Sequence, residues 1–185
     1  MAPPIMPKSL KKFTAVQIKV VNNSVALAEE LVSEHYKMSA GQWLRPKYDV
    51  KTLADLSPPE IVHGPFAQII RYKGRRNDKS LESSTYDFYK ICLQDHFILS
   101  AMKSSGHLKL FPFVLYIVAH ELIHIVRFSK FLQNFNATPA EILAEETRVH
   151  ETTHKILSKL PINDLPPVLA FYEKWRTPIE GILSP

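Results

Sequence analysis

Two histidines four residues apart, His120 and His124, are the residues of this chain best placed to do chemistry together. On an α-helix, side chains at positions i and i+4 lie on one face a turn apart, so both imidazoles can reach the same metal ion. Glu121 points about a hundred degrees round the helix from His120, where it misses the metal but can reach a water bound to it. The pattern HExxH therefore predicts a metal site with a base beside it.

The surroundings of this motif favour a metal over a purely structural role. The three residues interrupt an apolar run that begins at Phe111. Charged and imidazole groups in the middle of an apolar helix are costly unless they are paired or bind a metal. The alternative is a core helix whose polar groups hydrogen-bond to their neighbours. Charged residues within 108–128 also argue against a membrane span.

Two helices are predicted around the motif. The first is expected to begin near Pro112, because proline is favoured at the start of a helix, and to end at about 131. A polar break follows, and then Thr138, Pro139 and Glu141 have the pattern of a capping box, with Thr138 as the N-cap. A second helix is therefore expected over about 139–160. The connection is short, so the two helices should be antiparallel neighbours.

This arrangement predicts a third metal ligand. Folding the chain back near residue 135 places His124 opposite Glu146 and His120 opposite His150. His120, His124 and Glu146 then form a three-ligand zinc site with one position open for water. His150 could orient His120, act as a fourth ligand or contact the substrate.

Two alternatives to this ligand set remain open. Glu145 could replace Glu146, although it lies about a hundred degrees away from the face that carries His150. A second motif, His150–His154, could pair with the first as in di-iron helical bundles. A di-iron site would need further inward carboxylates, for which Glu29 and Glu30 are candidates. Glu151 and His154 of that motif are also displaced by about 7 Å from the first pair in the predicted register.

The motif and the spacing together resemble the gluzincin branch of the zincin zinc metallopeptidases. The HELIH sequence is followed by Glu146 on the next helix, 22 residues after His124. The resemblance implies that His120, His124 and Glu146 bind Zn²⁺ and that Glu121 is the catalytic general base. His150 stands where this family usually has an aspartate that supports the first histidine. The resemblance covers only about residues 85–155.

The fold expected from this resemblance is α+β, rich in helix, with a small sheet before the HExxH helix. Residues 66–72 suit a strand, and 89–99 are the candidate for the edge strand that lines the substrate cleft in such folds. Residues 13–37 are predicted to form one or two helical stretches, with Asn23–Ser24 as the candidate boundary, and 39–64 to be mostly loop with a short helical turn at Pro59. A short amphipathic helix is expected over 168–175.

We therefore expect one compact domain with two regions: an N-terminal helical region with a Pro-rich loop over 1–64, and a zincin-like metal-binding region over 65–185. A length of 185 residues and a hydrophobic content of 45% suit one domain with an ample core.

Composition bounds the cellular setting and the partners. The single cysteine, Cys92, excludes a disulfide within the chain and suits a reducing compartment. The N-terminus lacks the pattern of a secretory signal, so a cytoplasmic location is expected. The net charge is +5, with basic clusters at 8–12 and 71–76. No nucleic-acid motif accompanies these clusters, so a solvated terminus and loop are favoured over nucleic-acid binding.

The function expected from the sequence is zinc-dependent hydrolysis of peptide bonds in a peptide or protein substrate. Glu121 would take the proton of a zinc-activated water and pass it to the leaving amine. The alternatives are a non-catalytic zincin-like interaction or regulatory protein that retains zinc, and a di-iron helical protein. A base beside the metal favours the enzyme, because a purely structural site needs none.

Overall fold

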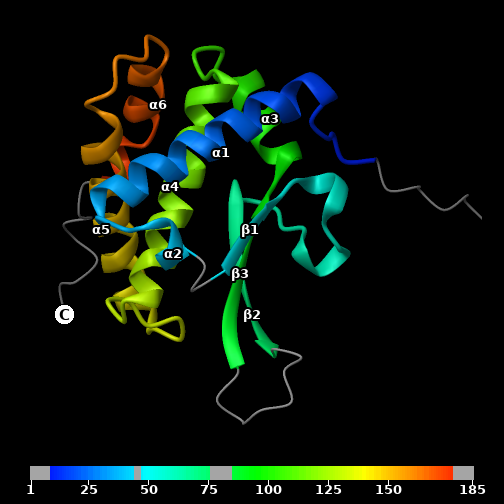
Figure 1. The fold of residues 1–185 in the computed structure, drawn as a ribbon. Helices are drawn as coiled ribbons and strands as arrows, with labels where there is room; N and C mark the ends of the chain where they lie inside the picture. The colour runs from blue at the N-terminus through cyan, green and yellow to red at the C-terminus, as the bar shows by residue number, and fades with distance from the viewer. Residues whose placement is uncertain (1–8, 44–46, 76–84, 177–185) are drawn as a thin grey trace, which may run out of the picture.

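A computed structural model describes residues 9–43, 47–75 and 85–176 and shows a helix-rich α+β fold with a small mixed sheet (Figure 1). The expected fold class is thus confirmed at that level. The two predicted basic clusters, 8–12 and 71–76, are each described except for one residue: Lys8 and Arg76 lie outside the described residues.

The first long helix, α1 (Ala15–His35), is one continuous helix and runs through the candidate boundary at residues 23–24. Thr14 and Gln17 form a capping box at its start. Ser24 does not interrupt the helix, because its hydroxyl donates to the carbonyl oxygens of Val20 and Phe111. The side chains that α1 buries are mostly small and follow a helical spacing: Val21, Ser24, Ala28 and Val32. This stripe lets α1 pack closely on α4.

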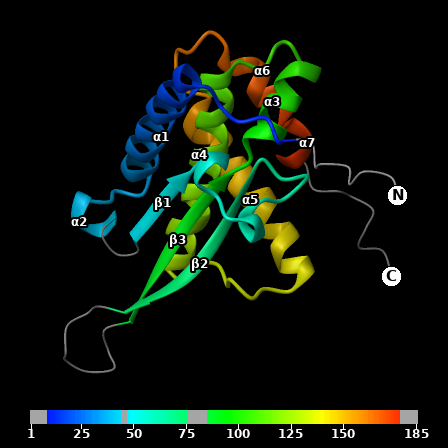
Figure 2. The same cartoon turned by 90° about the vertical axis from the view of Figure 1, so that its right-hand side faces the viewer.

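Helix α4 (Leu110–Ser129) carries the HExxH motif and is the central element of the fold (Figures 1 and 2). It contacts α1, α5, α6, β2 and β3. Its length and hydropathy would suffice for a membrane span, but 78% of its apolar 18-residue stretch is buried inside the protein, as in the core helix of a folded domain.

Helix α5 (Pro139–Leu157) follows the polar connection and packs on α4. Its capping box is the predicted one: the Thr138 hydroxyl accepts from the Glu141 N–H, and the Glu141 carboxylate accepts from the Thr138 N–H. The helix ends three residues before the predicted limit at 160. The two long helices of the motif therefore form the expected hairpin.

The sheet has the order β1-β3-β2, with β1 (Lys47–Lys51) parallel to β3 (Thr85–Leu93) and β2 (Ala67–Arg75) antiparallel to it.

The edge-strand prediction for 89–99 was wrong. Residues up to Leu93 form the central strand, and from Asp95 the chain is helical. The edge strand beside α4 is β2, which includes most of the strand predicted at 66–72. Strand β1 lies in a segment that was expected to be mostly loop.

Short elements complete the fold. They are α2 (Ala40–Trp43), η1 (Leu53–Asp55), η2 (Pro58–Glu60), α3 (Asp95–Ser104), α6 (Leu165–Phe171) and α7 (Glu173–Arg176). The predicted turn at Pro59 is η2. The helix predicted over 168–175 is divided at Tyr172 into α6 and α7, which pack against each other beside α4 and α5.

Candidate metal centre

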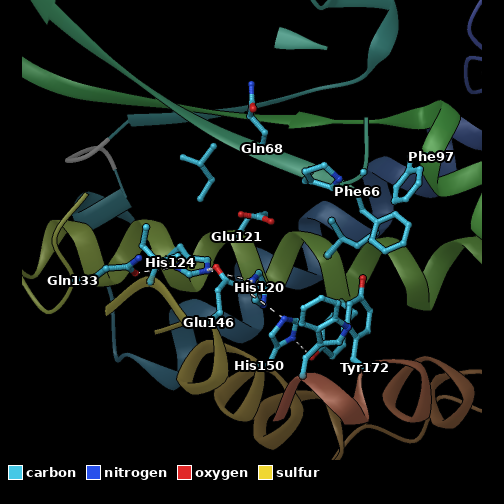
Figure 3. Close-up of a pocket in the computed structure, with 18 of the residues that line it drawn as sticks. Phe66, Gln68, Phe97, His120, Glu121, His124, Gln133, Glu146, His150 and Tyr172 are labelled. Atoms are coloured by element: carbon cyan, nitrogen blue, oxygen red, sulfur yellow. Dashed lines mark hydrogen bonds and ion pairs between the residues drawn. The ribbon is translucent and has the colours of Figure 1, made fainter. Parts of the chain in front are cut away.

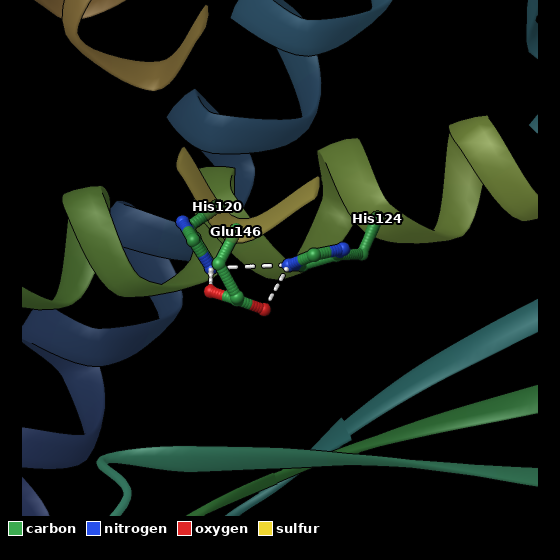
Figure 4. Close-up of side chains that lie close together, drawn as sticks. All are labelled: His120, His124 and Glu146. Atoms are coloured by element: carbon green, nitrogen blue, oxygen red, sulfur yellow. Dashed lines mark hydrogen bonds and ion pairs between the residues drawn. The ribbon is translucent and has the colours of Figure 1, made fainter. Parts of the chain in front are cut away.

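Three side chains from α4 and α5 converge as the sequence predicted (Figure 4). The Nε2 atoms of His120 and His124 lie 3.2 Å apart. Glu146 faces both, with one carboxylate oxygen 3.2 Å from His120 Nε2 and the other 2.9 Å from His124 Nε2. The three ligand atoms lie within 4.8 Å of one another, so this group could hold a metal ion.

The spacing and chemistry of this group fit zinc. Zn²⁺ binds imidazole nitrogen and carboxylate oxygen at about 2.0–2.2 Å with tetrahedral angles, which places its ligand atoms about 3.3 Å apart. The distances between the two imidazole nitrogens and the carboxylate oxygens are close to this value. Three protein ligands would leave a fourth position for water or substrate.

Gln133 orients the second histidine. Its Oε1 lies 2.9 Å from Nδ1 of His124 and, as an amide oxygen, can only accept a hydrogen bond there. If a metal binds, this hydrogen bond keeps the proton of the neutral imidazole on Nδ1 and leaves the Nε2 lone pair of His124 for the ion. This support comes from the connection between α4 and α5 and was not predicted from the sequence.

The first histidine is held by packing. Its ring lies 4.2 Å from the ring of His150, centroid to centroid. Nδ1 of His150 is 2.8 Å from the Tyr116 hydroxyl, and its Nε2 lies 3.8 Å from Glu146. His120 Nδ1 is buried and has no hydrogen-bond partner in the described part of the chain. His150 therefore lies beside the centre but is not one of the three grouped ligands, and it does not orient His120 by a hydrogen bond.

Glu145 points away from the histidines. It is buried, and its carboxylate pairs with the Arg127 guanidinium and with Arg148, whose Nη1 is 2.7 Å away. These contacts occupy both of its oxygens. The structure thus brings Glu146, and not Glu145, to the two histidines.

The electrostatics of the cluster favour an ionised Glu146. Burial alone would raise the pKa of this carboxyl, but hydrogen bonds from His120 and His124 outweigh burial and hold the pKa well below its ordinary value. Burial lowers the pKa of His124, but the hydrogen bond to Glu146, the nearby carboxylate charges and the hydrogen bond to Gln133 together outweigh burial and bring this pKa to about 8. Burial lowers the pKa of His150 to about 3, so this imidazole is neutral at pH 7.

The centre lies in an open cleft of about 740 Å³ between β2 and the two helices (Figure 3). Glu121 lies on α4 beside the histidines and lines this cleft. Burial raises the pKa of its carboxyl. Strand β2 contributes Ala67, Gln68 and Ile69 to the opposite wall.

Aromatic side chains close one end of the cleft. Phe66 packs on Phe97, with 4.8 Å between the ring centroids, and Tyr172 stacks on Tyr116 at 3.9 Å. Phe66, Phe97 and Tyr172 lie on the same side of Glu121, away from Gln133 (Figure 3). The cleft is therefore polar at its centre and apolar at this end.

The carboxylates considered for a di-iron site do not join the cluster. Glu29 accepts a hydrogen bond from the Tyr48 hydroxyl, while Glu30 and Glu151 are exposed. Among the described residues, His120, His124 and Glu146 are the one group with a geometry suited to a metal.

No family model matches this chain, and searches of curated proteins and of solved structures found no significant match.

Proposed function

We propose that this protein is a zinc-dependent metallopeptidase of the zincin type, with His120, His124 and Glu146 as the zinc ligands. The observation that carries the proposal is the convergence of two imidazole nitrogens and one carboxylate beside Glu121 at the base of an open cleft. When bound at such a site, zinc lowers the pKa of a water molecule toward 7 and polarises a carbonyl group.

Glu121 is the proposed general base. It lies next to His120 in the sequence but is not part of the ligand group, so its carboxylate is free to take a proton from the attacking water. The same carboxylate would then deliver that proton to the leaving amine. The raised pKa of Glu121 supports this role, because a base with a higher pKa holds the proton better between the two steps.

A polypeptide is the proposed substrate. Strand β2 is the edge of the described sheet, so one side of its backbone is not paired with β3. An extended peptide can bind such an edge through main-chain hydrogen bonds. The part of β2 that lines the cleft faces the centre from across the cleft, which would place a scissile peptide bond between strand and helix.

A reducing compartment such as the cytoplasm is the proposed setting. The single cysteine, Cys92, is buried in β3, and burial raises the pKa of its thiol to about 11. A protonated, buried thiol is unreactive and has no partner for an intrachain disulfide.

The test is hydrolysis of a mixed peptide library, followed by mass spectrometry. The wild type reconstituted with zinc should generate cleaved peptides. The Glu121→Gln variant should retain zinc and lose turnover by at least about a hundredfold, because it keeps the shape but not the base. A zinc-loaded wild type that cleaves nothing would identify a non-catalytic zinc protein. Equal turnover by Glu121→Gln would contradict the assignment of the base.

A further inference from the structure

Large apolar side chains gather on the surface where α4 turns back into α5. They are Phe131, Leu132, Phe135, Ile142 and Leu143, and all five are exposed. We call this set the corner patch. Phe135 and Ile142 also line the cleft, so the corner patch continues the cleft surface outward.

Phe131 has a backbone conformation that suits glycine. Its φ is 55°, in the left-handed region. The N–H of Leu132 donates to the Arg127 carbonyl and the N–H of Phe131 to the Phe128 carbonyl, which is the Schellman pattern that usually places glycine at this position. A residue with a Cβ is strained there, and the ring, 95% exposed, gains little packing in return. An exposed ring held in this way points to contact with another molecule.

Charged groups next to the corner patch are already engaged within the protein. Lys130 and Arg71 each lie over an aromatic ring, and Arg127 pairs with Glu145. The Glu141 carboxylate caps the first turn of α5. Anionic lipid surfaces are recognised by clusters of unpaired cations beside apolar side chains. The corner patch suits the apolar side chains of a polypeptide better than it suits a bilayer.

We propose that the corner patch is a substrate-binding extension of the cleft, which selects polypeptides with large apolar side chains. The part of the substrate that leaves the cleft at the Gln133 end would lie against Phe131, Leu132 and Leu143. This inference rests on the proposed function, because it takes a polypeptide to be the occupant of the cleft. It adds a specificity determinant outside the metal centre.

Binding can be measured without turnover. The parent protein is the zinc-loaded Glu121→Gln variant, and the probe is a fluorescein-labelled peptide of about ten alternating Leu and Thr residues, long enough to span about 33 Å when extended. A matched peptide has Ser in place of Leu. Fluorescence anisotropy gives the dissociation constant of each peptide.

A combined variant tests the corner patch. It carries Phe131→Gly, Leu132→Ser and Leu143→Ser, which change exposed side chains and relieve the strained backbone at residue 131. The matched control is Val16→Ser, which removes an apolar side chain that is 71% exposed on α1, a helix that does not line the cleft. We expect the combined variant to bind the Leu peptide on the order of tenfold more weakly than the parent does. It should also lose the preference of the parent for the Leu peptide over the Ser peptide. The control should bind as the parent does.

Several outcomes would overturn the proposal. One is equal binding by parent and combined variant, and another is a parent that does not prefer the Leu peptide. A parent dimer that the combined variant converts to a monomer in sedimentation would assign the patch to self-association. Binding of the parent, but not the variant, to anionic vesicles would assign it to a membrane.

The binding role of the corner patch and the peptidase activity can be tested separately. Patch-dependent binding of the Leu peptide by a protein whose wild type hydrolyses nothing would support the corner patch and count against the enzyme. Hydrolysis by the wild type, with binding unaffected by the combined variant, would leave the enzyme and overturn the corner patch.

Discussion

At the residue scale, the proposed metal centre depends on groups that hold the imidazoles as well as on the three proposed ligands. His124 is fixed by a hydrogen bond to Gln133, whereas His120 is held by the ring of His150. Groups that orient ligands in this way typically contribute about 10–100-fold to metal affinity.

Replacing Gln133 by Leu should weaken zinc binding by about tenfold, because His124 would lose the acceptor that fixes its Nδ1 proton. Competition against a chelating dye measures the affinity. Gln133→Glu, which retains an acceptor oxygen, should bind zinc about as tightly as the wild type. Unchanged affinity in Gln133→Leu would show that this hydrogen bond does not support the centre.

Replacing Glu145 by Ala should reduce the free energy of unfolding by about 3 kcal/mol, because it leaves the largely buried Arg127 guanidinium without its partner. Urea denaturation of the metal-free protein measures this, with the exposed Glu151→Ala as the control. Zinc binding should persist in Glu145→Ala. Loss of zinc without loss of stability would make Glu145 the ligand in place of Glu146.

The sequence predicted the residues that share a helix face but not those that reach across an irregular segment. The spacing of His120 and His124, with the capping box at Thr138, was enough to bring Glu146 opposite them. Gln133 could not be found in this way, because it lies between the helices, where no periodicity relates it to His124. Tyr116 lies within the helix predicted over 112–131, but its contact with His150 depends on side-chain packing.

At the scale of secondary-structure elements, Glu60 joins η2 to two strands. Its carboxylate accepts hydrogen bonds from Lys90 Nζ at 2.6 Å and from the Tyr72 hydroxyl at 2.8 Å. The backbone N–H of Ser57 donates to its other oxygen. The hydrogen bond from Lys90 makes the largest contribution to lowering the pKa of Glu60, which falls from its ordinary 4.5 to about 2.

This shift predicts a pH dependence of stability. A carboxyl whose pKa is lower in the folded state stabilises the fold above the unfolded pKa, and this contribution is lost as the pH falls through the folded pKa. The wild type should therefore exceed Glu60→Gln in free energy of unfolding by about 1–2 kcal/mol at pH 7. The difference should shrink between pH 4.5 and about 2. Urea denaturation at several pH values would contradict this if the difference did not change with pH.

At the end of α4, one substitution is expected to stabilise the fold. Phe131→Gly should increase the free energy of unfolding by about 1 kcal/mol, because glycine adopts the left-handed conformation without strain. The control is Phe131→Ala, which removes the ring but keeps the Cβ and should gain little. Thermal denaturation compares the three proteins. A gain by alanine as large as that by glycine would point to the ring, and not the backbone, as the source of the cost.

The elements were predictable where hydrophobic periodicity is long. Helices α4 and α5 have such patterns, and their bounds lie within three residues of those expected. Strand β1 was missed because it is short and lies among prolines and glycines that favour loops. Strand β3 was misplaced as an edge, since an apolar segment followed by a helix does not reveal which strands flank it.

At the scale of the whole molecule, the fold surrounds one apolar helix that carries the polar centre. Helix α4 is covered by α1 on one side, while α5 and strand β2 leave the face with Glu121 open as the cleft. The centre thus combines two buried imidazoles with a partly exposed carboxylate and with Glu121, which lines the cleft. This combination is what the proposed hydrolysis requires.

The most direct test of the account is the metal content of protein purified without a histidine tag, measured by inductively coupled plasma mass spectrometry. The comparison is between the wild type, Glu146→Ala and Glu145→Ala. The proposed zinc site predicts about one zinc per chain in the wild type and in Glu145→Ala, and almost none in Glu146→Ala. A wild type that binds no metal when zinc is supplied would contradict it, because the three converging side chains would then be a hydrogen-bonded polar cluster.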